Sequence, residues 1–119
     1  MTTQQIAERL VELLGQGQFE TAQKELLAED AVSTEPDYAT GVDKPTHGLE
    51  NIIGKGHQFT QMIEAVHGIT VSEPLVSGNS FACVLTMDVT MKGQGRSTMS
   101  ELSLYRVKDG KVVSEQFFM

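Results

Sequence analysis

The sequence predicts an α+β domain, in which a cone-shaped, curved antiparallel sheet packs against three N-terminal helices. Two observations lead to this prediction. Up to Ile63 the apolar residues recur at helical spacing, whereas after Gly68 they alternate with a period of two, as in strands. Helices that precede hairpin-linked strands indicate a sheet with its helices on one face. A curved sheet closed by helices would enclose an apolar interior, where a ligand could bind.

Two helices are expected to form a hairpin at the N-terminus. Thr2 and Gln5 have the spacing of a capping box, so the first helix should begin after Thr2. Gly15 and Gly17 end this helix. Its apolar face consists of Ile6, Leu10, Leu13 and Leu14. A second helix follows, with the apolar stripe Phe19, Ala22, Leu26 and Leu27. Because so few residues join the two helices, they should pack together.

The middle of the chain is predicted to hold a short strand, a loop and a third helix. Glu29-Asp30 ends the second helix, and 31–35 form a strand that stops at Pro36, which cannot donate a ladder hydrogen bond. A loop is expected over 37–45. Thr46 is a suitable N-cap for the third helix. The apolar face of that helix consists of Leu49, Ile52, Ile53, Phe59 and Ile63.

The rest of the chain is predicted to be sheet. A strand that includes Ile69 and Val71 is interrupted at Pro74. The clearest strand has a continuous apolar face, made of Phe81, Cys83, Leu85, Met87, Val89 and Met91. Two further strands, over 99–107 and 111–119, are joined by a hairpin turn.

Composition limits the classes of function. With 119 residues, of which 39% are apolar and 21% charged, the chain fits a single folded domain over 1–119. A net charge of -7 without a basic cluster argues against nucleic acid or an anionic membrane as a partner. No apolar run is long enough to span a bilayer, and the N-terminus does not resemble a signal peptide, so a cytoplasmic location is expected. Cys83 is the only cysteine, which excludes an internal disulfide.

Neither a metal nor another cofactor is expected. His47, His57 and His67 lack a metal-binding spacing such as HExxH. The Gly54-Lys55-Gly56 motif lies in a helical pattern and not after a strand, so it is a weak phosphate site. His47 lies near a predicted helix start, where the helix dipole favours a neutral imidazole. It is therefore a candidate hydrogen-bond donor at the mouth of the pocket.

Several short motifs occur in a particular order along nearly the whole chain. They are Leu27-Ala28-Glu29-Asp30-Ala31-Val32, Glu35-Pro36, His47-Gly48, Gln94-Gly95-Arg96 and Gly110-Lys111-Val112-Val113-Ser114. In this order they resemble the nuclear-transport-factor-two-like superfamily, and within it the SnoaL-like polyketide cyclases and the ketosteroid isomerases. That superfamily contains enzymes and non-enzymes, so the resemblance implies the fold more strongly than an activity.

The resemblance to the isomerases implies roles for three positions. The general base of those enzymes lies just before the proline that ends the first strand, and Glu35 holds that position here. Their oxyanion-binding tyrosine corresponds to Leu10, and their protonated aspartate corresponds to Ser103. The resemblance therefore implies a pocket carboxylate without the two principal oxyanion donors.

The catalytic candidates are Glu35, Ser103 and Tyr105. A carboxylate inside an apolar cone would have a raised pKa, which suits a general base; the alternative is a solvated Glu35 at the edge of a loop. Glu101, Ser103 and Tyr105 share one strand face by alternation. If that face looks into the cone, Ser103 or Tyr105 could polarise a ligand carbonyl. The alternative for Tyr105 is an ordinary aromatic side chain with its hydroxyl at the rim.

A small apolar organic molecule is the expected ligand. The residues expected to bind it are His47, Phe59, Ile63, Met87, Val89, Glu101 and Phe117. The apolar members of this set could equally be ordinary core, since methionines serve both purposes.

The opposite face of the sheet is unusually apolar. It carries Val84, Thr86, Leu102, Leu104, Val112 and Phe118. A homodimer that packs sheet against sheet is the natural explanation. Three hypotheses about function remain open: a cofactor-independent isomerase or cyclase, a non-catalytic binding domain, and a purely structural dimer with a filled interior.

Overall fold

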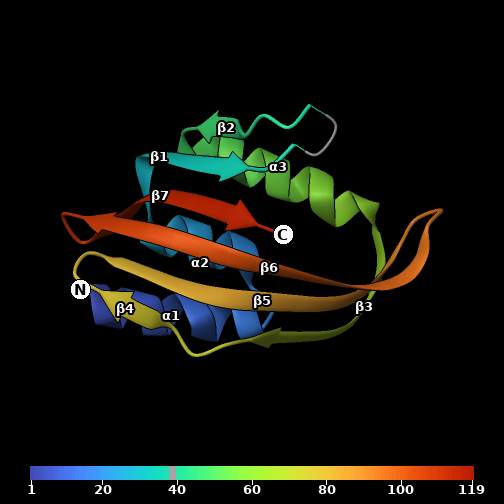
Figure 1. Cartoon of the computed structure of the whole chain (residues 1–119), viewed down its shortest axis with the longest axis horizontal. Helices are drawn as coiled ribbons and strands as arrows, with labels where there is room; N and C mark the ends of the chain where they lie inside the picture. Colours follow the sequence, from blue (N-terminus) through green and yellow to red (C-terminus); the bar gives the residue numbers. More distant parts are fainter. Residues whose placement is uncertain (38–39) are drawn as a thin grey trace.

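The computed structural model describes residues 1–37 and 40–119. Within these residues the helices are α1 (Thr3–Gly15), α2 (Phe19–Leu26) and α3 (Leu49–Met62). The strands are β1 (Leu27–Glu35), β2 (Lys44–His47), β3 (Ile63–Val71), β4 (Leu75–Ser77), β5 (Ser80–Met91), β6 (Gly95–Lys108) and β7 (Lys111–Phe118). The helices lie on one side of a curved sheet (Figure 1). The predicted α+β class and the three N-terminal helices are confirmed.

The described strands form one open, mixed sheet of seven strands. Its order is β2-β1-β7-β6-β5-β3, and β4 also pairs with β5. Neighbouring strands are antiparallel except β1 and β7, which are parallel. A parallel pair needs a long connection, and here most of the chain separates the two strands. The sheet is therefore not wholly antiparallel, because β1 joins it beside the last strand.

Helix α1 begins as the sequence predicts. Thr2 Oγ1 accepts a hydrogen bond from the Gln5 backbone N–H at 3.1 Å, and Gln5 Oε1 accepts one from the Thr2 backbone N–H at 2.9 Å. An ion pair of 2.7 Å between Arg9 and Glu25 joins α1 to α2. Among the described residues, no helix is long and apolar enough to cross a membrane. The buried face of α1 consists of Ile6, Ala7, Leu10, Leu13 and Leu14.

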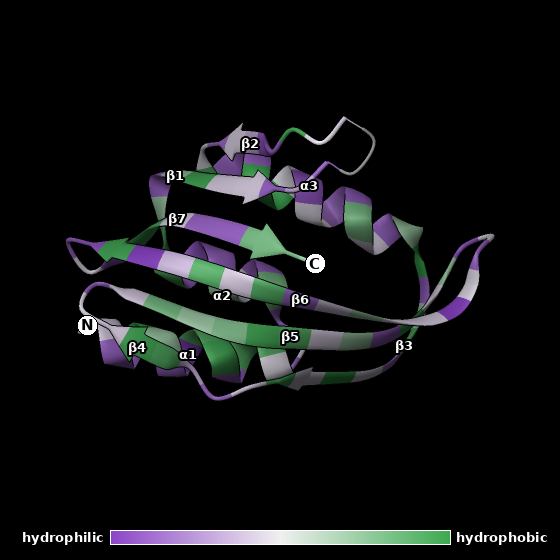
Figure 2. Ribbon diagram, in the orientation of Figure 1, coloured by the Kyte–Doolittle hydropathy of each residue, from purple (hydrophilic) through white to green (hydrophobic). Residues whose placement is uncertain are grey.

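The core lies between the helices and the inner face of the sheet. Every second residue of β5 from Phe81 to Met91 is buried, which confirms the predicted alternation. Figure 2 shows hydrophobic bands along β5 and on α1. The buried residues form two clusters, one centred on α1 and Phe81, the other on Met87 and Val89.

Three strands begin earlier than the sequence pattern predicts. β1 starts at Leu27, directly after α2, and β3 starts at Ile63, directly after α3. Leu27 and Ile63 fit the apolar stripe of the preceding helix as well as the inner face of a strand. Because both periods accept the same residue, periodicity alone cannot locate the boundary. β6 likewise starts at Gly95, before the predicted Met99.

An edge strand replaces the end of the predicted 37–45 loop. Lys44 and Pro45 pair with β1, while Tyr38 and Ala39 of that loop lie outside the described residues. Thr46 is also part of this strand, so it is not the N-cap of α3. The N-cap is Gly48, whose φ is 90°. This backbone conformation favours glycine, because a side chain would be strained there.

A β-bulge places Val112 in the core. The register between β6 and β7 shifts so that Arg106 pairs with Ser114 while Val107 pairs with Val112. The extra residue in β7 reverses the alternation, and Val112 is 0% exposed. The prediction that Val112 lies on the outer face with Phe118 is therefore wrong.

Paired substitutions test this register. Val112→Ala should lower the free energy of unfolding by about 2 kcal/mol, because it removes buried methyl groups. Val84→Ala, at a side chain that is 40% exposed, should change it by less than about 0.5 kcal/mol. Urea denaturation measures both values, and equal effects would place the two side chains in similar surroundings and contradict the bulge.

Candidate functional site

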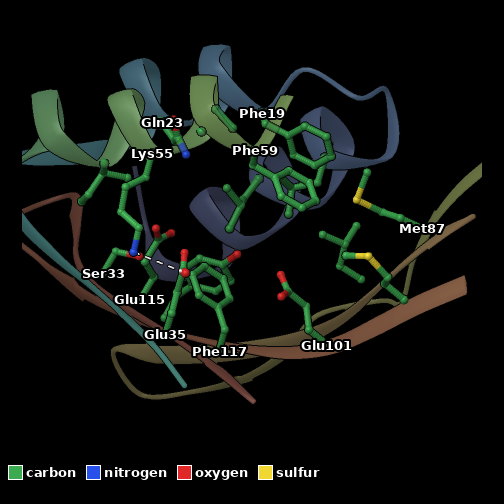
Figure 3. A pocket seen from close by; sticks show the side chains of 18 of the residues that line it. Phe19, Gln23, Ser33, Glu35, Lys55, Phe59, Met87, Glu101, Glu115 and Phe117 are labelled. Carbon is green, nitrogen blue, oxygen red and sulfur yellow. Dashed lines mark ion pairs between the residues drawn. The ribbon is translucent and has the colours of Figure 1, made fainter. Parts of the chain in front are cut away.

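A cavity of about 340 Å³ lies between the inner face of the sheet and the helices. Figure 3 shows α2 and α3 on one side of it and the strands on the other. Its volume is in the range of small-molecule sites. The walls are mainly apolar and include Leu10, Phe19, Phe59, Met87, Met99 and Phe117. Three glutamates, Glu35, Glu101 and Glu115, also line it.

Glu115 is the most deeply buried of the three carboxylates. On β7 it pairs with Ser33 of β1 on one side and with Tyr105 of β6 on the other. Its residue is only 6% exposed. Burial raises the pKa of Glu115 to about 7, and the charges of Glu101 and Glu35 add to the rise, although a hydrogen bond from the Ser33 hydroxyl opposes it. Near neutral pH this carboxyl group is therefore partly protonated.

Glu101 lies further along β6, opposite Leu85 of β5. Burial is the main cause that raises its pKa to about 7, and the negative charge of Glu35 is the second. Among the described residues it makes no hydrogen bond or ion pair. Its carboxylate points into the cavity beneath Phe59 (Figure 3). The charge of Glu101 thus has no opposite charge beside it among the described residues, and a ligand in the cavity could reach its carboxylate.

Glu35 lines the cavity but is partly solvated, so its surroundings are closer to the second sequence-based reading, a solvated carboxylate at the edge of a loop. It is the last residue of β1, directly before Pro36, and its side chain is 48% exposed. Lys55 of α3 reaches down to it, with 3.3 Å between Nζ and Oε2 (Figure 3). Lys55 is the one basic side chain in the lining formed by the described residues. The charge of Glu35 is therefore already partly compensated.

Tyr105 lines the cavity, whereas Ser103 does not. Tyr105 is 3% exposed and stacks on Phe81 with ring centroids 4.8 Å apart. Burial, and then the charge of Glu115, raise the pKa of Tyr105 well above its ordinary value of 10, so the phenol stays protonated and can donate. The nearby Ser103 hydroxyl opposes this rise, yet it makes no hydrogen bond of normal geometry to any described residue. Ser103 is fully buried and out of reach of a ligand.

Four of the residues predicted to bind a ligand line the cavity, and three do not. Phe59, Met87, Glu101 and Phe117 belong to the lining. Val89 is 0% exposed inside the core, and Ile63 packs against the same apolar cluster. His47 is exposed on β2, where it pairs with Val32. It lies outside the lining because the predicted helix start is in fact an edge strand.

Contacts between α2 and α3 hold the helical side of the cavity. Glu20 of α2 pairs with His57 of α3 and with Lys24 of its own helix. Both interactions lower the pKa of Glu20, and the one with His57 has the larger effect. Gly56 of α3 faces the Gln23 side chain of α2, which lies 3.8 Å from the position that a Cβ on Gly56 would take, an ordinary van der Waals distance. This packing fixes the turn of α3 that carries Lys55.

Sequence reasoning misses two charged residues of this site. Glu115 lies two residues before Phe117 on one strand, so alternation places both side chains on the inner face, and this signal could have identified it. The contact between Lys55 and Glu35 joins α3 to β1, and no local pattern in the sequence predicts it.

A family model described as a SnoaL-like domain matches residues 1–119. The chain therefore belongs to the SnoaL-like family, and the resemblance stated above is confirmed. No curated protein matches the chain.

Solved structures show the same fold. A proposed SnoaL-like polyketide cyclase from Mesorhizobium loti is 39% identical, with a TM-score of 0.87 and 100% of both chains covered. IdmH, a proposed polyketide cyclase from Streptomyces antibioticus, is 22% identical, with a TM-score of 0.73, over 99% of this chain and 91% of that one. A protein with a ketosteroid isomerase-like fold from Catenulispora acidiphila is 21% identical, with a TM-score of 0.71, over 96% and 84%.

The buried acid at Glu115 should make stability depend on pH. Its folded pKa of about 7 lies above the model-compound value of 4.5, so the native state holds the proton more tightly than the unfolded chain does. This contribution is complete below about pH 4.5 and is lost as the pH rises through about 7. Glu115→Gln should therefore match the wild type at pH 5 and exceed it at pH 8 by on the order of 2 kcal/mol.

Thermal or urea denaturation at both pH values measures the difference. Glu64→Gln, at an exposed residue of β3 outside the cavity, is the matched control and should show no such dependence. Equal stability of wild type and Glu115→Gln at pH 8 would show that the Glu115 carboxylate is well solvated.

Proposed function

We propose that the chain binds a small, largely apolar carbonyl compound in the cavity and transfers a proton on it, as an isomerase or cyclase does, without a cofactor. The observation that carries this proposal is Glu101, an unpaired carboxylate in an apolar cavity with a pKa of about 7. A general base works best when its pKa lies near the working pH. Glu101 meets this condition in a cavity of suitable size.

The proposed step uses the side chains that face the cavity. The Glu101 carboxylate removes a proton from the carbon next to the carbonyl group, so a C–H bond breaks, an O–H bond forms on Glu101, and the electron pair moves to the ligand oxygen. The protonated Tyr105 hydroxyl is a donor for that oxygen. Glu101 then returns the proton to a different carbon of the conjugated enolate. Alternatively, the enolate carbon attacks a second carbonyl of the same molecule, the C=O π bond breaks as the C–C bond forms, and Glu101 returns the proton to the resulting alkoxide. The first outcome is an isomerisation and the second a cyclisation.

Glu35 remains the alternative base. It lines the cavity and holds the position that the isomerase pattern gives to the base. Lys55 already pairs with it, whereas nothing among the described residues compensates Glu101. We therefore prefer Glu101 and assign Glu35 the role of setting the charge at the mouth of the cavity.

Deuterium exchange tests the proposal without knowledge of the natural substrate. The wild type should speed the incorporation of deuterium from D₂O into an apolar enolisable ketone such as 2-tetralone, followed by proton NMR. Glu101→Gln should lower the enzymatic rate at least ~100-fold, because that is the usual contribution of a general base. Glu64→Gln should not change it.

Each other result has a definite meaning. Loss of exchange in Glu35→Gln with full exchange in Glu101→Gln would make Glu35 the base. Binding of the ketone with no exchange above the buffer rate would contradict catalysis on this probe. It would favour a non-catalytic binding module, a reading that the apolar Leu10 and the buried Ser103 at the two isomerase donor positions also support.

We also propose that the outer face of the sheet packs against a second copy of the chain. Val84, Leu102 and Phe118 form a row across β5, β6 and β7, with 40%, 44% and 45% of each residue exposed. Leu104, 36% exposed, lies in the next row opposite Ala82. This part of the face carries no charge, although the chain has a net charge of -7, so two copies can meet here without like-charge repulsion.

Sedimentation equilibrium tests the proposed dimer. Wild-type protein should be dimeric at micromolar concentration, and Leu102→Glu should be monomeric because it places two carboxylates in the interface. Met62→Glu, at a residue that is 50% exposed at the end of α3 on the helix side of the sheet, is the control and should stay dimeric. A monomeric wild type, or a dimer unaffected by Leu102→Glu, would contradict the proposal.

A further inference from the structure

Glu115 is a buried carboxyl group that the proposed proton transfer does not use. It lines the cavity, yet only 6% of the residue is exposed. Its strand neighbours on either side are Ser33 and Tyr105. The hydrogen bond from Ser33 satisfies one acceptor position, whereas an ionised carboxylate offers about four. Glu115 therefore has unused acceptor capacity that faces an open volume.

No basic side chain among the described residues pairs with Glu115. Within the part of the chain that the structure describes, Lys55 is the one basic side chain in the lining, and it is paired with Glu35 at the mouth. The other titratable groups that influence Glu115 are Glu101 of β6 and Glu35 of β1, and both are acids. Among the side chains of the described residues, the lining thus carries three carboxyl groups and one ammonium group. A bound cation would relieve this imbalance, and a bound anion would increase it.

The apolar walls suit an organic cation. Phe19, Phe59 and Phe117 all line the same cavity (Figure 3). Aromatic faces attract a cation that is held away from water, and they also pack against an apolar body. A metal ion is a poorer match, because the described residues contain no group of three or more His, Cys, Asp or Glu side chains arranged to hold one.

We propose that the ligand of this cavity carries a basic amine, and that its ammonium group binds the Glu115 carboxylate. Glu115 is thereby a specificity-determining residue, and the ligand class is an apolar amine of a size that fits about 340 Å³. The inference rests on the ligand site given under the proposed function, but it does not depend on proton transfer by Glu101.

Binding of an amine should release a proton. Free Glu115 has a pKa of about 7. A neighbouring ammonium group favours the charged carboxylate and lowers this pKa. At pH 7 part of the Glu115 carboxyl groups hold a proton before binding, so a fraction of a proton per site should leave on binding.

Three probes of one shape but different charge test the proposal: 2-aminoindane, the neutral 2-indanol and the anionic indane-2-carboxylate. Calorimetric titration at pH 7 should show the amine binding at least about tenfold more tightly than the alcohol, with the carboxylate weakest. The enthalpy measured in phosphate and in Tris gives the number of protons released. In Glu115→Gln the preference for the amine should fall to about onefold, while Glu64→Gln should keep it.

Glu115→Asp keeps the charge and serves as a second variant if Glu115→Gln does not fold. It should retain a preference for the amine over the alcohol. Three results would overturn the proposal. The wild type could bind the amine and the alcohol equally, Glu115→Gln could keep the preference for the amine, or none of the probes could bind. Loss of the preference in Glu101→Gln alone would move the ammonium site to Glu101 and overturn the assignment to Glu115. Because these titrations measure binding, they give a result whether or not deuterium exchange occurs.

Discussion

The removal of water from two carboxyl groups on the inner face of the sheet is the interaction on which this site depends. Glu101 and Glu115 have side chains that would be fully ionised in water, yet burial raises the pKa of each to about 7. A protein keeps buried acids of this kind at a cost in stability, since hydrophobic residues of similar volume would fill the space at no electrostatic cost. Their position in a cavity, and not in the packed core, connects that cost to binding or chemistry.

The fold explains how the cavity remains open. The long strands β5 and β6 extend beyond the region that α1 covers, and α3 begins only after the edge strand β2 (Figure 1). The buried residues accordingly form two clusters and not one. The carboxyl groups come from β1, β7 and β6, which are neighbours in the sheet although β1 is far from the other two in sequence. The parallel pairing of β1 with β7 brings Ser33 beside Glu115 and so completes the polar part of the lining.

Local signals predict the parts of this structure that depend on local physics. The capping box of Thr2 and Gln5 and the alternation in β5 are of this kind, and both are confirmed. Leu27 and Ile63 suit both a helix and a strand, so the boundaries next to them could not be predicted. Contacts between distant elements could not be predicted either: the bulge that buries Val112 depends on the register with β6, and the ion pair of Glu35 depends on the position of Lys55 on α3.

The most direct measurement is a carbon-13 NMR titration of protein labelled at the glutamate side-chain carboxyl carbons. Our account predicts two resonances that titrate at about pH 7, one absent from Glu101→Gln and the other from Glu115→Gln. A midpoint near the ordinary value of 4.5 for both residues would show that the two carboxylates are solvated. That result would contradict both the general base proposed at Glu101 and the desolvated acid on which the ligand selectivity depends.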